Sequence, residues 1–396
     1  MVLKLDMIQT VALAMVVLTV GNYIRKKANF LEKYCIPAPV IGGLIFAIMA
    51  LVLRQTGILV FEMNTVLQDF FMTAFFTTIG FTASFRLLRK GGFQVIIFLI
   101  LAVVLVIFQD IVGVALAKVF DLNPLIGLCT GSVPMTGGHG TSGSFAPMFE
   151  SAGAIGATTV AMASATFGLV MGSMIGGPIG KRLIEKNNLT SRAELEIATD
   201  LCEEDTDTVA LNSSSFMTGI AQILFAMGIG TIISMLLQMT GLKFPSYVGA
   251  MFAGAIIRNI SDMTNLYEVK LKEISVFGDV SLTIFLAMAL MGLKLWELAD
   301  LAVPMIVMLL AQTLLMATFA YYITFNLMGR DYDAAVMACG HCGFGMGATP
   351  NAMANMSTIT SKYLPAPKAF FILPLVGSLF IDFINIMVIT FFMNLF

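Results

Sequence analysis

Long apolar stretches separated by short polar segments recur along the whole chain. Ten of them approach or exceed the length that crosses a bilayer as a helix, about 20 residues. They predict spanning helices at 7–24, 37–53, 67–88, 93–118, 153–180, 213–239, 245–260, 275–296, 301–328 and 367–396. This pattern is typical of an all-α polytopic membrane protein.

Two further apolar stretches, 124–149 and 332–356, are rich in glycine. Glycine weakens a helix interior and lets the backbone turn sharply or come close to a ligand. Irregular backbone at membrane depth is tolerated only where it is buried in protein or lines an aqueous cavity. We therefore expect the second stretch to form a poor helix, and each stretch to form a re-entrant hairpin at a binding site.

The two halves of the chain share the same order of elements. Three glycines of the first half have counterparts exactly 209 positions later, and a glutamine has one 203 positions later: Gly131 and Gly340, Gly138 and Gly347, Gly168 and Gly377, Gln109 and Gln312. We predict two repeats, 1–180 and 213–396, each with five spanning helices and one hairpin. A polar, acidic, cytoplasmic linker, 181–212, joins them. Because five is odd, the second repeat is inverted in the membrane.

The distribution of basic residues tests this topology. With both termini outside, 17 of the 22 Lys and Arg residues fall in the inner loops, as the positive-inside rule requires. The first apolar stretch is followed by Arg25, Lys26 and Lys27 without a small-residue cleavage site, which favours a retained helix. Inverted repeats with broken helices at the midplane are typical of secondary transporters.

Composition supports the membrane class and excludes others. The chain is 58% hydrophobic and 12% charged, whereas soluble domains carry about twice that charge. A net charge of -2 without a basic patch argues against nucleic-acid binding. Cys339 and Cys342 form a C-x-x-C motif without the βαβ surroundings of a redox protein, so packed thiols are favoured over a redox or zinc site.

The hairpins supply groups that could bind an anion. Free backbone amides at a turn or a helix N-terminus attract negative charge, and hydroxyls add donors. The alternative is that the glycines only permit close helix packing. The substrate-binding candidates are Ser132, Thr136, Gly137, Gly138, His139, Gly140, Thr141, Ser142, Gly345, Gly347, Thr349, Asn351 and Asp382.

No Arg or Lys is expected in the middle of a helix, so a carboxylate substrate would need amides, hydroxyls and a bound cation. Sodium suits the exposed carbonyl groups of broken helices. The sodium candidates are Thr77, Thr78, Gly345, Asn355, Asp382 and Asn385. A carboxylate in a membrane is a functional candidate, although Asp382 could instead be a paired structural residue. Asp110 is expected to be less buried. His139 and His341 are expected to donate to carbonyls rather than relay protons.

Several motifs resemble the bacterial sodium/glutamate symporter family. They are 137–141, 163–170, 176–178, 286–298, 340–350 and 354–356, with Phe380, Asp382 and Asn385. The resemblance covers nearly the full chain except 181–211. It implies sodium-coupled uptake of L-glutamate across the inner membrane, with sodium co-transported and no organic cofactor. It also implies a homodimer in the lipid bilayer, in which a part carrying both hairpins slides against a scaffold in an elevator-type mechanism.

Three rival functions remain open. A sodium- or proton-coupled symporter of dicarboxylates or hydroxycarboxylates shares this physics, but its substrate has no ammonium group for Asp382 to hold. A passive channel would need a continuous pore. An enzyme is disfavoured because Ser132 and His139 share a hairpin with no acidic residue between Asp121 and Glu150. The helices at 7–24, 37–53, 213–239 and 245–260 are the expected scaffold.

Overall fold

The computed structural model describes residues 2–28, 37–86, 92–189, 212–239, 245, 247–264, 266–296 and 301–396. Most of the predicted linker, Cys35 and Cys202 lie outside these ranges. Apart from two short strands, the described chain is almost entirely helical. Strands β1 (Val2–Leu5) and β2 (Val60–Met63), which the apolar pattern did not predict, pair in parallel, with Val2 opposite Val60.

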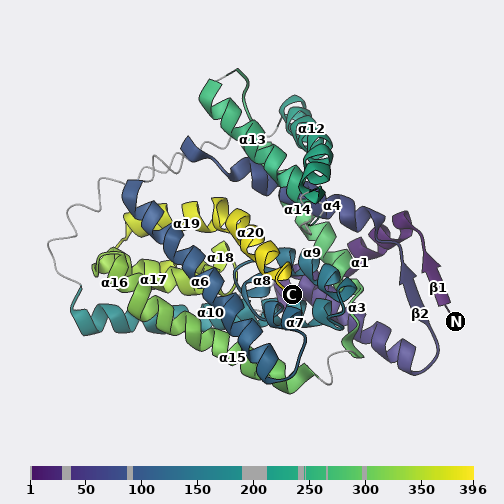
Figure 1. The fold of residues 1–396 in the computed structure, drawn as a ribbon, viewed down its shortest axis with the longest axis horizontal. Coiled ribbons are helices and arrows are strands. Elements are labelled where there is room, and N and C mark those ends of the chain that lie inside the picture. Colours follow the sequence, from purple (N-terminus) through teal and green to yellow (C-terminus); the bar gives the residue numbers. More distant parts are fainter. Residues whose placement is uncertain are drawn as a thin grey trace.

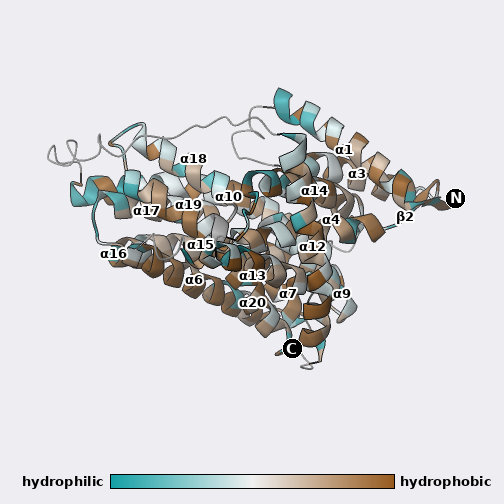
Figure 2. Ribbon diagram, turned by 90° about the horizontal axis from the view of Figure 1, so that it is seen from above, coloured by the Kyte–Doolittle hydropathy of each residue, from teal (hydrophilic) through white to brown (hydrophobic). Residues whose placement is uncertain are grey.

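Among the described residues, seven helices are long and apolar enough to span a membrane. They are α1 (Met7–Lys27), α3 (Ala38–Gln55), α6 (Gly92–Val119), α10 (Ala157–Asn187), α12 (Ser213–Gln238), α14 (Leu271–Met291) and the continuous segment Ala302–Leu327. Figure 2 shows apolar residues along most of the helices and hydrophilic residues mainly near their ends. The chain is a multi-pass membrane protein, and the count of ten spans stays a prediction.

One group of helices, the first body, consists of α1, α3, α4 (Val66–Thr82), α12, α13 (Val248–Thr264) and α14. α1 packs on α3, α12 packs on α13, and both pairs contact α4 or α14. These contacts bring backbones together at small residues. A Cβ atom built at Gly42 would lie 2.1 Å from the carbonyl oxygen of Val17, and one at Gly230 would lie 2.2 Å from Ala250 Cα. Only glycine fits at such crossings.

The second body is built around α6, α10 and the last quarter of the chain (Figure 1). It contains α7 (Pro124–Leu128), α8 (Ser132–Met135), α9 (Gly138–Ser151) and α15 (Ala302–Thr318). α15 continues through the π-helix η4 (Phe319–Thr324) into α16 (Phe325–Leu327). α17 (Tyr332–Gly345), α18 (Thr349–Thr360), α19 (Pro367–Leu379) and α20 (Ile381–Met393) complete it.

Two apolar clusters organise these bodies. One lies within the second body and joins α6, α10, α17, α18 and α19. The other lies between the bodies, where α3, α4 and α14 meet α7, α9 and α20. In it Phe76 of α4 stacks on Tyr247 with ring centroids 4.1 Å apart, and Tyr247 also contacts Phe145 of α9. The segment 124–151 therefore lies against the first body.

Several predicted boundaries were wrong. α10 continues through Asn187, seven residues into the predicted linker, where Asn188 takes a left-handed cap. α14 begins at Leu271 in a predicted loop, and α4 ends at Thr82. The stretch 367–396 is not one straight helix, because α19 and α20 meet at a bend of 41°. Gly377 weakens the helix just before this bend.

Candidate functional site

Short breaks interrupt the helices of both predicted hairpin stretches. In the first, α8 and α9 are separated at Thr136 and Gly137, and Gly138 has φ = +63°. In the second, α17 and α18 are separated by Met346, Gly347 and Ala348. A Cβ atom built at Gly138 would lie 3.3 Å from the carbonyl oxygen of Gly347. The two breaks, more than 200 residues apart in sequence, are therefore adjacent.

The expectation that the second glycine-rich stretch forms a poor helix was wrong up to Gly345. α17 runs without interruption through Gly340 and Gly343. A Cβ atom built at Gly343 would lie 2.5 Å from Ala352 Cα, and one at Gly340 would lie 2.4 Å from Leu373 Cδ1. Close packing against α18 and α19 offsets the low helix propensity of glycine. For these two glycines, the packing interpretation fits the structure.

Gln109 of α6 joins the two broken segments. Its Nε2 donates to the carbonyl oxygen of Gly345 at 2.6 Å, and its Oε1 accepts from Thr136 Oγ1 at 2.8 Å. Gln312 of α15 donates through Nε2 to the backbone oxygen of Gln109 at 2.7 Å. Both glutamines are fully buried. Gln109 and Gln312, which the sequence paired as repeat counterparts, thus belong to one hydrogen-bonded network.

Asp110, the next residue of α6, fixes the start of α8. Ser132 donates to its carboxylate twice, from the backbone nitrogen at 2.7 Å and from Oγ at 3.0 Å. Asn385 of α20 donates to the carbonyl oxygen of Ser132 at 3.3 Å. Asp110 has 0% exposure, so the expectation that it would be less buried was wrong. Lys118 and Asp121 lie two to three turns further along, outside this buried crossing.

Asparagines of α18 attach that helix to α10. Asn351 Nδ2 donates to the carbonyl oxygen of Leu169, and Asn355 Nδ2 donates to that of Gly172, both at 2.9 Å. Among the described residues, the buried acceptors Asn351 Oδ1, Asn385 Oδ1 and Gln312 Oε1 have no hydrogen-bond partner, and neither has Ser142 Oγ. Buried polar atoms are rarely left unpaired. These oxygens could serve as ligands of a cation.

The two histidines bond to threonines rather than to backbone carbonyls. His139 Nε2 lies 2.9 Å from Thr166 Oγ1, and His341 Nδ1 lies 2.9 Å from Thr324 Oγ1. His341 also stacks on Phe344 with centroids 4.8 Å apart. Thr324 belongs to the π-helix, a feature that often marks functional sites. The expected carbonyl partners are absent from the described residues.

The remaining candidates have separate surroundings. Gly140, Thr141 and Ser142 lie in the first turns of α9, while Gly137 caps that helix. Thr349 Oγ1 would lie 3.2 Å from a Cβ atom at Gly377. Asp382 is partly exposed in the first turn of α20. Thr77 and Thr78 donate to carbonyls of their own helix, and they pack against Gly254 and Gly278 of the first body. Thr77 and Thr78 thus have no direct contact with the Gln109 network.

The sequence profile described as sodium/glutamate symporter matches residues 3–365. The chain belongs to the sodium/glutamate symporter family. It is 42% identical to a sodium/glutamate symporter of Escherichia coli (strain K12) over 394 residues, 99% of this chain and 98% of the relative. A sodium/glutamate symporter of Haemophilus influenzae is 42% identical over 95% of this chain and 94% of the relative.

Among solved structures, a sodium proton antiporter of Methanocaldococcus jannaschii is similar over 98% of this chain and 97% of that one. The TM-score is 0.43 and the identity 13%. The family members compared are named as symporters and not as enzymes. Our expectation that this family member is not an enzyme is therefore confirmed.

The cysteines of this symporter-family chain fit a packing role. Cys129, Cys339 and Cys342 are free and buried, and Cys342 Sγ donates to the Ala338 carbonyl within α17. Within the described ranges, no group of three or more His, Cys, Asp or Glu residues could hold a metal ion. A zinc site involving the C-x-x-C motif thus has no support there.

Sequence reasoning missed the central role of Gln109 and Asp110. The offset between Gln109 and Gln312 was the available signal, since polar side chains facing apolar helices need partners. The expectation that no Arg lies well inside a helix was also wrong. Arg258 lies in the second half of α13, and its side chain is only 13% exposed. The predicted helix 245–260 contained Arg258 near its end, whereas α13 continues four residues further, to Thr264.

Proposed function

We propose that this protein is a secondary transporter that takes up L-glutamate together with sodium ions. The observation that carries the proposal is the meeting of the two helix breaks at Gly138 and Gly347 within a buried polar network. Family membership at 42% identity to proteins named sodium/glutamate symporters supports the same solute and ion.

The substrate would lie at these breaks. Backbone amides at the N-terminal ends of α9 and α18 favour a carboxylate. Both ends lie next to the meeting point, and Thr136, Thr141 and Ser142 supply hydroxyls from the first hairpin. Gly137, Gly138, His139 and Gly140 form the adjoining turn, and Gly347, Thr349 and Asn351 form the opposite one. Asp382 is the proposed partner of the substrate ammonium or of a cation.

Sodium would bind to oxygen atoms of the same region. Hard cations prefer carbonyl, amide and carboxylate oxygens. Asn385 Oδ1 is buried without a partner in the described chain, and Gly345 supplies a carbonyl at the end of α17. Asn355 and Asp382 are further candidates. Thr77 and Thr78 remain candidates from the sequence, with less support because their hydroxyls already donate within α4.

The membrane arrangement follows the repeats. We propose inverted repeats at 1–180 and 213–396 around the cytoplasmic linker 181–212, ten spans, re-entrant hairpins and both termini outside the inner membrane. The matching packing of α1 on α3 and of α12 on α13 supports the repeats. Our proposed elevator moves the second body along the first, in a homodimer whose scaffold includes α1, α3, α12 and α13.

The alternative is a symporter of dicarboxylates or hydroxycarboxylates, driven by sodium or protons. It uses the same helix ends for carboxylates but leaves Asp382 without an ammonium partner. The family match favours glutamate over this alternative.

Labelled L-glutamate uptake into proteoliposomes tests the proposal. An inward sodium gradient should drive accumulation, and potassium in place of sodium should abolish it. Equal uptake in potassium would point to protons or a passive route. No glutamate uptake by folded protein, with uptake of labelled succinate or citrate instead, would establish the alternative.

A further inference from the structure

A pocket of about 270 Å³ lies inside the first body, between α4, α13 and α14. Most of its wall is apolar, but two charged side chains of opposite sign line it, Arg258 of α13 and Asp279 of α14. Thr78, Thr82 and Ser275 also line it, and the hydroxyls of Thr78 and Thr82 donate to carbonyls of their own helix. A small pocket with one cation, one anion and hydroxyls matches a zwitterion better than it matches a purely apolar ligand.

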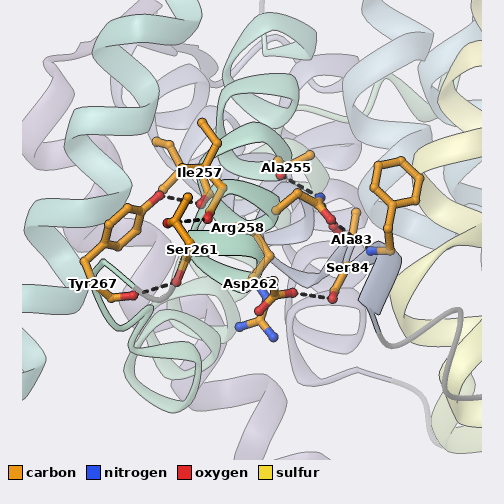
Figure 3. Close-up of polar contacts among 12 residues, drawn as sticks. Ala83, Ser84, Ala255, Ile257, Arg258, Ser261, Asp262 and Tyr267 are labelled. Carbon is orange, nitrogen blue, oxygen red and sulfur yellow. Dashed lines mark hydrogen bonds and ion pairs between the residues drawn. The ribbon is translucent and has the colours of Figure 1, made fainter.

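Hydrogen bonds hold Arg258 and the adjoining part of α13 in place. Its Nε donates to Asp262 Oδ2 at 3.1 Å, and the same carboxylate oxygen accepts from Ser84 Oγ at 2.5 Å (Figure 3). Asn259, the next residue, bonds to both the Ala83 carbonyl and the Phe85 nitrogen at the end of α4. In the described part of the chain, no hydrogen-bond partner engages the terminal nitrogens of Arg258. They remain available for a planar, bidentate contact with a carboxylate.

Asp279 provides the opposite charge. Its side chain is exposed and has no hydrogen-bond or ion-pair partner among the described residues, and it belongs to α14, a helix long enough to span a membrane. An unpaired carboxylate in that position is costly and marks a functional site. An ammonium group would offset that cost.

The pocket leads toward the proposed substrate site. Phe75, which lines the pocket, and Leu282, one turn of α14 beyond Asp279, both face Gly140 of α9. A Cβ atom built at Gly140 would lie 3.2 Å from Phe75 Cε1 and 3.4 Å from Leu282 Cδ1. These two side chains separate the pocket from the first turn of α9, two residues after the break.

We infer that this pocket is a second binding site for the α-amino acid, a vestibule on the proposed cytoplasmic end of the transport route. Arg258 receives a carboxylate of the substrate, and Asp279 receives its ammonium group. Phe75 and Leu282 stand between this vestibule and the hairpin tips. The inference rests on the proposed function and extends it to a site that contains no hairpin residue.

Binding of labelled glutamate to detergent-solubilised protein in sodium tests the vestibule, because both faces are then open to solution. Removing one charged hydrogen bond is expected to raise Kd about tenfold. Asp279→Asn and Arg258→Gln should each show this rise. Asp279→Glu, which retains the carboxylate, should stay near wild type, and Arg258→Lys should lie between. Asp69→Asn, which alters an exposed carboxylate of α4 outside the pocket, is the matched control.

An unchanged Kd in folded Asp279→Asn would overturn the inference. If the wild-type protein takes up glutamate in a sodium gradient, that result overturns only the vestibule and leaves the proposed function intact. If the wild-type protein shows no sodium-driven uptake, the proposed function itself is wrong. If Asp279→Asn does not fold, thiol labelling of a Ser275→Cys variant tests the vestibule instead. Glutamate should slow its labelling by a bulky thiol reagent but not the labelling of Ser357→Cys on α18. Equal labelling rates with and without glutamate would overturn the vestibule, as would protection by added phospholipid alone.

Discussion

At the scale of single residues, two carboxylates of the second body differ in their contacts. Asp110 is buried and accepts two hydrogen bonds from Ser132. Asp382 has neither a hydrogen-bond nor an ion-pair partner within the described chain, and it is partly exposed. Asp110 is therefore satisfied structurally, whereas Asp382 is available to a ligand.

Replacing Asp382 by Asn should abolish sodium-driven glutamate uptake without lowering thermal stability. The amide has nearly the same shape, and no contact within the described chain is lost, but the charge that would hold a cation is removed. Uptake and thermal unfolding of the purified variant check both parts. Uptake at the wild-type rate would remove Asp382 from the mechanism.

A control glycine distinguishes a binding role of Gly138 from backbone strain alone. Gly138 and Gly153 both have positive φ, at +63° and +96°. A side chain in the left-handed region costs about 1–2 kcal/mol, so Ala at either position should lower stability by about that amount. Only Gly138→Ala should also lose glutamate binding, because its Cβ atom meets the Gly347 carbonyl, whereas Gly153 faces open space. Equal binding losses in both variants, measured with labelled glutamate, would assign Gly138 a purely conformational role.

At the scale of elements, apolar length predicted most helices and failed at their ends. α6 and α12 lie within one residue of the predicted ranges, since apolar runs bounded by charge leave little freedom. α10 exceeds its range because a helix can continue into solvent with polar residues. Helix breaks at 136–137 and 346–348 fall within the two predicted hairpin stretches, but the irregular backbone is shorter than expected. Whether a glycine interrupts a helix depends on its neighbours, and Gly343 is buried against Ala352.

That dependence gives a prediction for α17. Gly343→Ala should destabilise the protein, because the added methyl group would force α17 and α18 apart at a backbone contact. Gly177→Ala in α10 is the control, since no atom lies within 4 Å of its added Cβ atom. There, Ala should be neutral or stabilising by about 0.5–1 kcal/mol. Thermal unfolding in detergent compares them, and a stable Gly343→Ala would contradict the packing role.

At the scale of the whole molecule, the site depends on contacts that no local pattern contains. The sequence paired Gln109 with Gln312 by position, but their hydrogen bonds require α6 and α15 to cross beside the end of α17. Likewise, the sequence placed Arg258 near the end of a predicted helix and did not indicate that it faces a pocket formed with two other helices. Local hydropathy reveals how long a helix is, whereas such crossings depend on packing between distant segments.

The elevator proposal makes a prediction about the interface between the bodies. Phe252 of α13 and Phe383 of α20 meet there, with ring centroids 5.2 Å apart. Phe46 of α3 and Phe61 of β2 have centroids 5.1 Å apart and include no residue of the second body, so they form a matched pair. Each pair would be replaced by cysteines in a chain whose five native cysteines are changed to serine.

A short bifunctional thiol reagent should then join each pair. If the second body slides along the first, joining 252 to 383 stops glutamate uptake, while joining 46 to 61 leaves it unchanged. A cleavable reagent should restore uptake when it is cut, which separates locking from damage. If mass spectrometry shows that positions 252 and 383 are joined and uptake is nevertheless undiminished, the result contradicts sliding at this interface. The transport motion would then have to be confined to the hairpins, because they alone could still expose the meeting point of Gly138 and Gly347 to alternate sides.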